Sequence, residues 1–420
     1  MTPEIKQRIE QIRRGEVPER YVKTALGLAP ANWKRYTFGD IYTERKEPGD
    51  ENLPLLMVSI HSGVSDGEVD AAELPKQVKQ IEDKSQYKKA VSGDLVFNMM
   101  RAWQGAIGTV RTTGMVSPAY IVAEPNDKAY PLFMDYYSRT PQMINQIDRQ
   151  SYGVTDFRKR LYWDSFAPIS CILPPIEEQQ KIATILTTQD KVIKLKEKRL
   201  AEKQRQKKYL MQQLLTGKKR LPGFNGAWEK EKLGKCASMC SGGTPDTKNE
   251  KYYGNDYIWI SIKDMTSAGK YTCSSERGLT EAGLLNCSAR LFPKGTILFA
   301  MYASIGECSI AETECCSSQA ILGIEPDSKL NNEFLYYLLS NSKGYFKSFG
   351  QASSQPNLNK GIVQSIVVQI PEIEEQAAIA EVLSAADREI ELLRQDIEQE
   401  KQKKKALMQL LLTGIVRITI

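Results

Sequence analysis

The feature that most constrains this sequence is a 45-residue segment that occurs twice, with a constant shift of 197 residues and no gap. Residues 173–217 and 370–414 are identical at 20 of the 45 aligned positions. Both copies begin with P-x-IEEQ and end with LMQ-x-LLTG. Because chance does not give such a match, we interpret the chain as an internal duplication.

Each copy of the segment is predicted to form one long helix. A proline precedes it, two glutamates occupy its first turn, and Gly217 or Gly414 stands where a left-handed cap closes many helices. A heptad repeat indicates a coiled-coil seam, with apolar positions at Ile182, Leu186, Ile193, Leu200 and Leu214 in the first copy and Ile379, Leu383, Ile390, Ile397 and Leu411 in the second. We expect the two helices to pair antiparallel, each about 60 Å long at a rise of about 1.5 Å per residue.

The segments between the helices repeat weakly. The run from Trp33 to Gly39 has a counterpart from Trp228 to Gly234, and the run from Gly93 to Phe97 has one from Gly295 to Phe299. Alternating patterns predict strands at residues 95–98, 297–301 and 362–370, and helical patterns occur at 131–148 and 331–348. The predicted class is α+β, with two globular domains separated by a two-helix antiparallel coiled coil and related by approximate two-fold symmetry.

This pattern predicts a definite order of domains. Residues 1–32 form an N-terminal helical arm, which we expect to pack on the tail after Gly414 or on a partner. The predicted segments that follow are a first globular domain (33–172), a central long helix (173–217), a second globular domain (218–369), a C-terminal long helix (370–414) and a tail (415–420).

The charge of the chain is concentrated in one stretch. The net charge is +6, while residues 190–220 contain twelve basic and three acidic residues and the matching residues 387–413 contain six of each. Such a basic strip can contact phosphate groups. The alternatives are a solvated helix face, or a face paired with acidic residues of the partner helix.

Composition excludes several classes of protein. The chain has no run of about 18 uncharged apolar residues and no apolar N-terminal stretch, so we expect a cytoplasmic protein without a membrane segment. Seven of the eight cysteines lie in the second half, without CxxC spacing, and the single histidine, His61, lies in the first half. We therefore expect reduced thiols and no metal site.

Several motifs give the chain a resemblance to a known family. They are MRAWQGAIG (100–108), GMVSPAY (114–120), SGGTP (241–245), IWISIKDM (258–265), SSQPNLNKG (353–361) and the two helix boundaries. Over essentially its whole length, the sequence resembles the specificity subunit of a type I DNA restriction-modification system.

The resemblance implies a non-catalytic role. In that family each globular domain is a target-recognition domain for one half of a bipartite, asymmetric site in double-stranded DNA, and the paired helices fix the spacing. The expected partners are two methyltransferase (modification) subunits and restriction subunits that translocate DNA. The expected cofactors, S-adenosylmethionine and ATP, would bind those partners and not this chain.

The sequence also lacks the motifs of the common enzymes that act on DNA. It contains no P-loop, no G-x-G-x-x-G turn, no Asn/Asp-Pro-Pro-aromatic tetrapeptide and no G-x-S-x-G elbow. Carboxylate nuclease chemistry stays open at this point. Two further interpretations also stay open: a coiled-coil protein-binding scaffold without DNA, and the recognition subunit of a related methyltransferase or nuclease complex of another type.

Candidate DNA-binding residues of the first domain lie in two loops. Arg101, Trp103 and Gln104 follow a predicted strand, and arginine and glutamine can pair with guanine and adenine. Alternatively, Trp103 belongs to the core and Arg101 to an ion pair. The second loop, residues 151–160, is basic with interleaved aromatic residues, and its candidates for phosphate or base contact are Tyr152, Asp156, Arg158, Lys159 and Arg160.

Candidates of the second domain differ in chemistry. The turn Ser241–Thr244, which includes Gly243, offers backbone N–H groups and the Thr244 hydroxyl to a phosphate, or is only a turn. The loop at 350–360 is rich in amides and hydroxyls, and its candidates are Gln351, Ser353, Ser354, Gln355, Asn357 and Lys360. Lys263 is a second backbone anchor, and Tyr302, Ser304 and Ser318 are weaker candidates.

Overall fold

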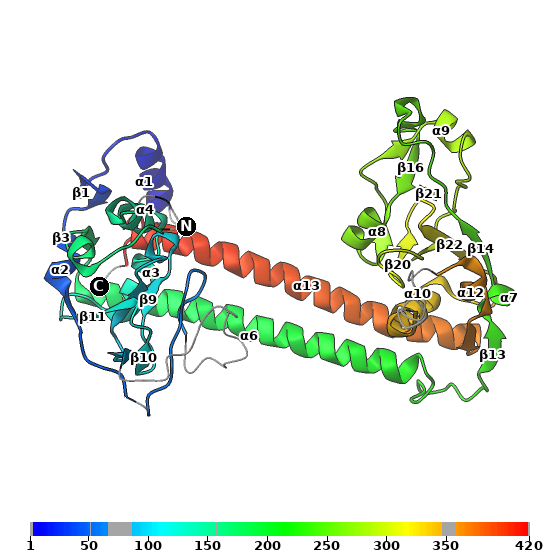
Figure 1. Ribbon diagram of the computed structural model, residues 1–420, viewed down its shortest axis with the longest axis horizontal. Coiled ribbons are helices and arrows are strands. Elements are labelled where there is room, and N and C mark those ends of the chain that lie inside the picture. Colours follow the sequence, from blue (N-terminus) through cyan, green and yellow to red (C-terminus); the bar gives the residue numbers. More distant parts are fainter. Residues whose placement is uncertain are drawn as a thin grey trace. The chain divides into compact units, whose positions relative to one another are not determined.

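The computed structural model describes residues 3–50, 52–65, 86–153, 155, 158–346 and 358–418. The chain packs as two compact units. The first unit combines Met1–Leu195 with Ile397–Ile420, and the second is Lys196–Asp396. The long helices α6 (Ile176–Leu214) and α13 (Ile373–Leu412) each contribute one half to each unit (Figure 1). Packing thus divides the helices between the units, whereas the predicted domain order gave each helix a segment of its own.

The first unit mixes short helices with antiparallel strands. Its helices include α1 (Pro3–Arg13), α2 (Phe38–Ile41), the 3-10 helix η2 (Ala102–Gln104), α3 (Pro131–Tyr137), α4 (Pro141–Gln150) and α5 (Trp163–Phe166). Its strands include β1 (Tyr21–Thr24), β2 (Gly27–Pro30), β3 (Lys34–Thr37), β4 (Tyr42–Glu44), β5 (Val58–Ser59), β6 (Gly63–Val64), β7 (Lys88–Ala90), β8 (Leu95–Asn98), β9 (Ile107–Thr109), β10 (Gly114–Val116), β11 (Tyr120–Pro125) and β12 (Ser170–Leu173). The central sheet has the order β4-β11-β8-β9.

The second unit has the same kind of architecture with different elements. Its helices include α7 (Leu233–Cys236), the 3-10 helix η4 (Glu250–Tyr252), α8 (Ile262–Ala268), α9 (Glu281–Leu285), α10 (Asn332–Asn341) and α12 (Lys360–Ser365). Its strands include β13 (Glu229–Lys232), β14 (Ala237–Ser241), β15 (Tyr253–Gly254), β16 (Tyr257–Ile260), β17 (Tyr271–Thr272), β18 (Gly278–Leu279), β19 (Ile297–Ala300), β20 (Cys308–Ala311), β21 (Cys316–Ser317), β22 (Ile321–Pro326) and β23 (Val367–Ile370). The main sheets have the orders β14-β22-β19-β20-β17 and β15-β18-β16-β21.

The central strand of each unit is buried on both faces. In β8, Leu95 and Phe97 pack into the core beneath α3, while Val96 packs into a second cluster on the other face. In β19, Ile297 and Phe299 join one cluster, while Leu298 and Ala300 join another. A strand covered on both faces is continuously apolar, as β8 and β19 are. The mixture of such strands with helices in both units confirms the predicted α+β class.

The first turn of each long helix is held by a buried glutamate. In the first unit Glu178, which is 0% exposed, accepts hydrogen bonds from Arg417 Nε at 2.8 Å and Nη2 at 2.7 Å. It also accepts one from Trp33 Nε1 at 3.3 Å. Arg417 follows the other long helix, α13. The glutamate therefore fastens the start of α6 to the chain that leaves α13.

The second unit repeats this arrangement, with the glutamate and the arginine at positions shifted by 197 and the tryptophan at a position shifted by 195. Glu375, which is 1% exposed, accepts two hydrogen bonds of 2.6 Å from Arg220 and one of 3.2 Å from Trp228 Nε1. The duplication has therefore kept both the residues and their contacts. We call each set of glutamate, arginine and tryptophan a helix-start clasp.

A buried glutamine follows each clasp. Gln179 Oε1 accepts a hydrogen bond from the Tyr130 amide at 2.8 Å, and its amide nitrogen donates to the Lys128 and Pro174 carbonyl oxygens. Gln376 repeats these contacts with Asn331, Lys329 and Pro371. Since these bonds satisfy buried backbone groups next to α3 and α10, they tie each globular domain to its helix.

Polar contacts between the helices alternate with the apolar seam. In the first unit, where the end of α13 lies beside the start of α6 (Figure 1), Lys404 pairs with Asp190 at 2.5 Å and Asp190 accepts a hydrogen bond from the Tyr136 hydroxyl at 2.6 Å. Burial first, and then the hydrogen bond to Asp190, raises the pKa of Tyr136. In the second unit Lys207, Asp387 and Tyr337 repeat this triad.

Ion pairs between the helices explain the part of the basic strip (residues 190–220) that faces the seam. Lys196 pairs with Asp396 at 2.8 Å, and Lys203 pairs with Glu389 at 2.8 Å. Arg199, Lys207 and Arg220 also pair with carboxylates of the other helix. Pairing with the partner helix accounts for this part of the strip, while Lys198, Arg205 and Lys208 face solvent.

A lysine ties the second globular domain to its long helix. The Lys270 ammonium lies where β17 begins and donates to the Tyr337 hydroxyl and the Ser384 hydroxyl, both at 2.8 Å. It also pairs with Glu333. Burial lowers the pKa of Lys270 despite that carboxylate. Lys270 therefore attaches the part of the domain around β17 to α13.

The N-terminal arm contacts the tail after Gly414, which confirms one of the two expectations for this arm. Arg8 Nη1 of α1 donates to the Ile415 carbonyl oxygen at 3.3 Å, and the Tyr21 hydroxyl donates to the Gly414 carbonyl oxygen at 2.7 Å. The hairpin of β1 and β2 was not predicted from the sequence. It places Ala29 against Trp33 in a small cluster.

One predicted strand was wrong in its first half. The run Ile362–Ile370 was expected to be extended, but residues 360–365 form α12 and only Val367–Ile370 form a strand. The Asn359 side chain accepts a hydrogen bond from the Ile362 amide, and this helix cap outweighs the alternating pattern. Likewise the helical run 131–148 is two helices, because Thr140 caps a new helix that begins at Pro141.

The helix-start clasp predicts a loss of stability on removal of its charge. Glu178→Gln leaves the Arg417 guanidinium without its carboxylate partner, and we expect the free energy of unfolding to fall by about 2–4 kcal/mol. The matched control is Glu177→Gln, an exposed neighbour in the same helical turn, for which we expect a loss below about 1 kcal/mol. Calorimetric unfolding of the full chain measures both, and equal losses would refute the role of the clasp.

Candidate nucleic-acid interface

The first candidate loop of the first unit lies directly after β8. The 3-10 helix η2 turns the chain, and Gly105, with a φ of 103°, closes it in a conformation that favours glycine. Arg101 and Gln104 are exposed. Trp103 is half-buried against the core, and its Nε1 donates to the Met100 carbonyl oxygen at 3.0 Å. The loop thus exposes two residues able to hydrogen-bond to bases.

The second candidate loop is closed by a short antiparallel bridge. The Tyr152 amide donates to the Arg160 carbonyl oxygen at 3.1 Å, and the Arg160 amide donates to the Tyr152 carbonyl oxygen at 2.9 Å. A Cβ on Gly153 would lie 2.4 Å from the Arg158 carbonyl oxygen. This close approach of the two arms therefore requires glycine at position 153.

The fold brings the two loops together. The Leu161 amide donates to the Met99 carbonyl oxygen at 2.9 Å, which joins the end of one loop to the start of the other. The Lys159 ammonium lies 5.0 Å from the centre of the Trp103 ring and 2.8 Å from Asp148 Oδ1. Lys159 and Trp103 therefore hold the loops against each other, and we call the described residues of these loops (99–105, 151–153, 155 and 158–162) the loop platform.

The predicted residues of the first unit divide into those that hold the platform together and those that are exposed on it. Trp103 and Lys159 contact each other within it, Trp103 packs partly against the core, and Arg160 donates to the Lys159 carbonyl oxygen. Arg101, Gln104, Tyr152 and Arg158 are exposed on it, while Asp156 lies outside the described residues. Contact of these residues with DNA stays a prediction.

Sequence reasoning missed two exposed residues of the platform, Met100 and Tyr162. Tyr162 lies between buried Leu161 and half-buried Trp163, and it forms the N-cap position of α5. Its ring centre is 5.8 Å from that of Tyr152. The sequence gives no signal for this exposure, because the burial of Leu161 and Trp163 is known only from the fold.

In the turn Ser241–Thr244 of the second unit, the two glycine amides predicted to bind phosphate are engaged with backbone carbonyl oxygens, whereas DNA contact by Ser241 and Thr244 stays a prediction. The Gly242 amide donates to the Ile321 carbonyl oxygen at 3.0 Å, and the Gly243 amide donates to the Ser317 carbonyl oxygen at 2.9 Å. The Gly243 carbonyl oxygen accepts from Trp259 Nε1, and a Cβ at this glycine would lie 2.2 Å from the Ala289 nitrogen. The glycines serve close packing between strands, so for their amides the alternative of a structural turn is correct.

The other candidates of the second unit are only partly described. The residues Gln351, Ser353, Ser354, Gln355 and Asn357 lie outside the described residues. Lys263 is exposed and pairs with Glu276 at 2.6 Å, a hydrogen bond that raises the pKa of its ammonium. Tyr302 is half-buried against the core, and Lys360 is exposed at the first position of α12. Their roles stay predictions.

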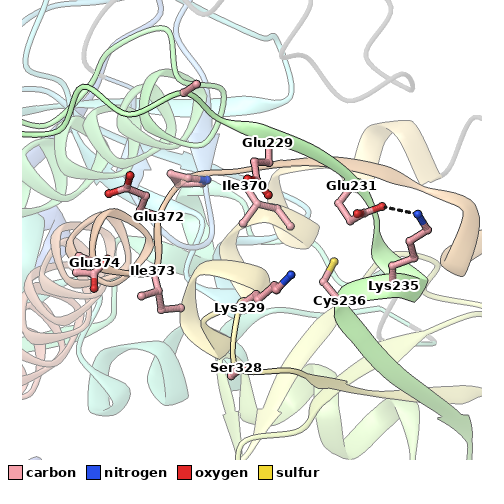
Figure 2. A pocket seen from close by; sticks show the side chains of 12 residues that line it. Glu229, Glu231, Lys235, Cys236, Ser328, Lys329, Ile370, Glu372, Ile373 and Glu374 are labelled. Carbon is pink, nitrogen blue, oxygen red and sulfur yellow. Dashed lines mark ion pairs between the residues drawn. The ribbon is translucent and has the colours of Figure 1, made fainter.

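A hollow of about 500 Å³ lies beside the start of α13 in the second unit. Figure 2 shows its lining, with Glu231 and Lys235 paired at 3.4 Å and Cys236 beside them. Half of the residues that line the hollow are charged, and they include Glu229, Lys329, Glu372 and Glu374. Since small-molecule sites are mainly apolar with few polar groups, this hollow does not fit a cofactor site.

Two further searches concern metals and membranes. Within the described ranges, no group of three or more His, Cys, Asp or Glu residues could hold a metal ion. In the same part of the chain, no helix is both long enough and apolar enough to cross a bilayer.

Comparison with known proteins identifies relatives over most of the chain. A sequence model of the type I restriction modification DNA specificity domain matches residues 60–204 and 225–402. The putative type I restriction enzyme MjaX specificity subunit of Methanocaldococcus jannaschii is 25% identical over 439 residues, which cover 95% of this chain and 97% of that protein. The MjaIX specificity subunit of the same organism is 35% identical over 167 residues, and this match spans only 39% of each chain.

A solved structure agrees with the fold. The S subunit of a type I restriction-modification system from M. genitalium superposes with a TM-score of 0.57 at 13% sequence identity, over 92% of this chain and 97% of that one. At this identity the likeness concerns the fold alone, and it confirms the predicted α+β architecture.

The close approach at Gly153 gives a direct test of the loop platform. We expect Gly153→Ala to break the bridge between Tyr152 and Arg160, because the added methyl group would overlap the Arg158 carbonyl oxygen. Amide hydrogen exchange at both bridge residues should accelerate at least tenfold, which corresponds to a local loss above about 1.4 kcal/mol. As control, a Cβ at Gly344 meets no atom within 4 Å, so Gly344→Ala should leave these amides unchanged. Unaltered exchange in Gly153→Ala would contradict this geometry.

Proposed function

Since the chain belongs to the type I restriction modification DNA specificity family, DNA sequence recognition is its role, and we propose that it recognises a bipartite, asymmetric site. One observation carries this proposal. Both helix-start clasps and both buried glutamines have been kept with their contacts, while the loops on the two domains differ in composition. A common frame with two unlike reading surfaces suits two unlike half-sites.

In the first domain, we assign DNA contact to the exposed residues of the loop platform. Arg101 and Gln104 are suited to base edges, since arginine pairs with guanine and glutamine with adenine in the major groove. Arg158 is suited to phosphate. For the described residues, no ion pair is formed by the side chains of Arg101 and Arg158, so both guanidinium groups are open to DNA.

We further propose that the chain is itself non-catalytic and acts with partners in the cytoplasm. Two methyltransferase subunits would supply S-adenosylmethionine chemistry, and restriction subunits would use ATP. The two long helices offer equivalent docking positions. Leu195 is 67% exposed and Leu392 is 65% exposed, and the two are related by the 197-residue shift. Because the duplication has kept an exposed leucine at both positions, we propose that each leucine contacts one methyltransferase subunit.

The rival interpretations have less support. A coiled-coil scaffold that binds only proteins is not favoured, because the matching family is one of DNA specificity domains. The relatives named above are specificity subunits of type I restriction enzymes, which also disfavours a recognition subunit of another type of complex.

The proposed function predicts the form of the methylated site. Single-molecule sequencing of native DNA, from cells with this chain and its methyltransferase, should show one motif in two parts with an unspecified spacer of several base pairs. Cells in which this chain is deleted are the control and should lack the motif. One contiguous motif would contradict the proposal.

The docking positions predict a change of stoichiometry. We expect Leu195→Asp or Leu392→Asp to weaken one of two methyltransferase contacts at least tenfold, because a buried leucine contributes about 1.5–3 kcal/mol. Mass photometry would then show complexes with one methyltransferase in place of two. Leu285, which is 77% exposed and lies on α9, is the matched control, and Leu285→Asp should leave two bound. Normal complexes with both helix variants would exclude docking at these leucines.

A further inference from the structure

The loop platform exposes an apolar surface that hydrogen bonding to bases does not explain. Met100 is 40% exposed, Tyr152 is 57% exposed and Tyr162 is 44% exposed. All three belong to the adjoining loops that the Leu161–Met99 hydrogen bond joins. We call Met100, Tyr152 and Tyr162 the apolar patch. Exposed apolar groups clustered in this way mark a binding surface.

The patch is rigid. Tyr152 is fixed by the two hydrogen bonds of its bridge to Arg160, and Tyr162 is fixed at the start of α5, where its carbonyl oxygen accepts from the Phe166 amide at 3.0 Å. The two rings lie 5.8 Å apart at an angle of 35°. A surface that keeps its shape before binding loses little conformational entropy when it binds.

The surroundings of the patch indicate the chemistry of its ligand. Arg101, Gln104 and Arg158 are exposed on the same two loops. Cationic and amide groups beside an apolar surface suit a polyanion that also presents a small apolar group. In duplex DNA that group is the 5-methyl of thymine, which lies in the major groove.

The geometry also disfavours insertion of the rings between base pairs. Wedges that unstack DNA are single apolar side chains placed between two bases. The Tyr152 and Tyr162 rings lie 5.8 Å apart, so neither stands alone as a single wedge. The pair is better suited to contact base edges from the groove.

We propose that the apolar patch contacts thymine 5-methyl groups in the half-site bound by the first unit, with Tyr152 and Tyr162 as specificity-determining residues. This inference rests on the proposed function. It adds to the hydrogen-bonding residues a second kind of readout, which distinguishes a thymine from a cytosine or a uracil by one methyl group.

The test replaces thymine by deoxyuridine, which removes only that methyl group. Binding of the complex with its methyltransferase subunits is measured on the mapped site, with each thymine of one half-site replaced in turn. For the wild-type complex we expect a loss of about fourfold at one or more positions of a single half-site, the effect of one buried methyl group. Tyr162→Ala and Tyr152→Ala should bind the thymine and uracil duplexes equally, whereas Tyr162→Phe, which keeps the ring, should retain the ratio.

Arg158→Ala is the matched control from the same loop. It should weaken binding to both duplexes alike and lower the slope of log affinity against log salt by about one, as expected for one lost phosphate contact. A thymine-to-uracil ratio that is the same in wild type and both alanine variants would overturn the proposal, as would a pair of half-sites without thymine. If wild type binds a scrambled duplex as tightly as the mapped one, the proposed function itself fails.

Discussion

The structure depends on two buried carboxylates, Glu178 and Glu375. A carboxylate without exposed surface is costly unless charge and hydrogen bonds compensate it, and here each receives a two-pronged arginine and an indole N–H. The arginine always comes from the chain that leaves the other helix. The start of one helix and the end of the other are therefore fastened by the same group, so neither helix can shift along its neighbour without breaking it.

Several contacts that hold the two long helices together recur in both units, although the exposed surfaces of the domains have diverged. Along the helices, the triad of Tyr136, Asp190 and Lys404 recurs as Tyr337, Asp387 and Lys207. The lysines lie at seam positions that an apolar heptad would fill, and a carboxylate of the facing helix neutralises each. Much of the basic strip is therefore part of the helix pairing, and its net charge is a poor guide to where DNA binds.

Local patterns carried the sequence predictions that were confirmed. The long helices, their seam and the left-handed glycines at 217 and 414, with φ of 67° and 70°, follow from residues close together in the chain. Predictions failed where contacts between residues far apart in the sequence determine the structure. The Gly243 amide was assigned to phosphate, yet Ser317 takes it, and the tie of Lys270 to α13 had no signal in its neighbourhood. The exposed Tyr162 was missed because burial of its neighbours depends on the folded core.

The same distinction explains why the loop platform can be specific. The Trp103 indole N–H donates to the Met100 carbonyl oxygen and the Lys159 ammonium pairs with Asp148, so both residues help to hold the loops in place. We expect the specificity to lie in the side chains that the fold leaves exposed around them. Substitutions at Arg101, Gln104 or Tyr162 alter what the surface contacts without touching the bonds that hold it, whereas a change at Gly153 or Trp103 alters the surface as a whole. A frame of this kind permits new half-sites to arise by exchange of a few exposed residues, while the helix-start clasps keep the domain on its helix.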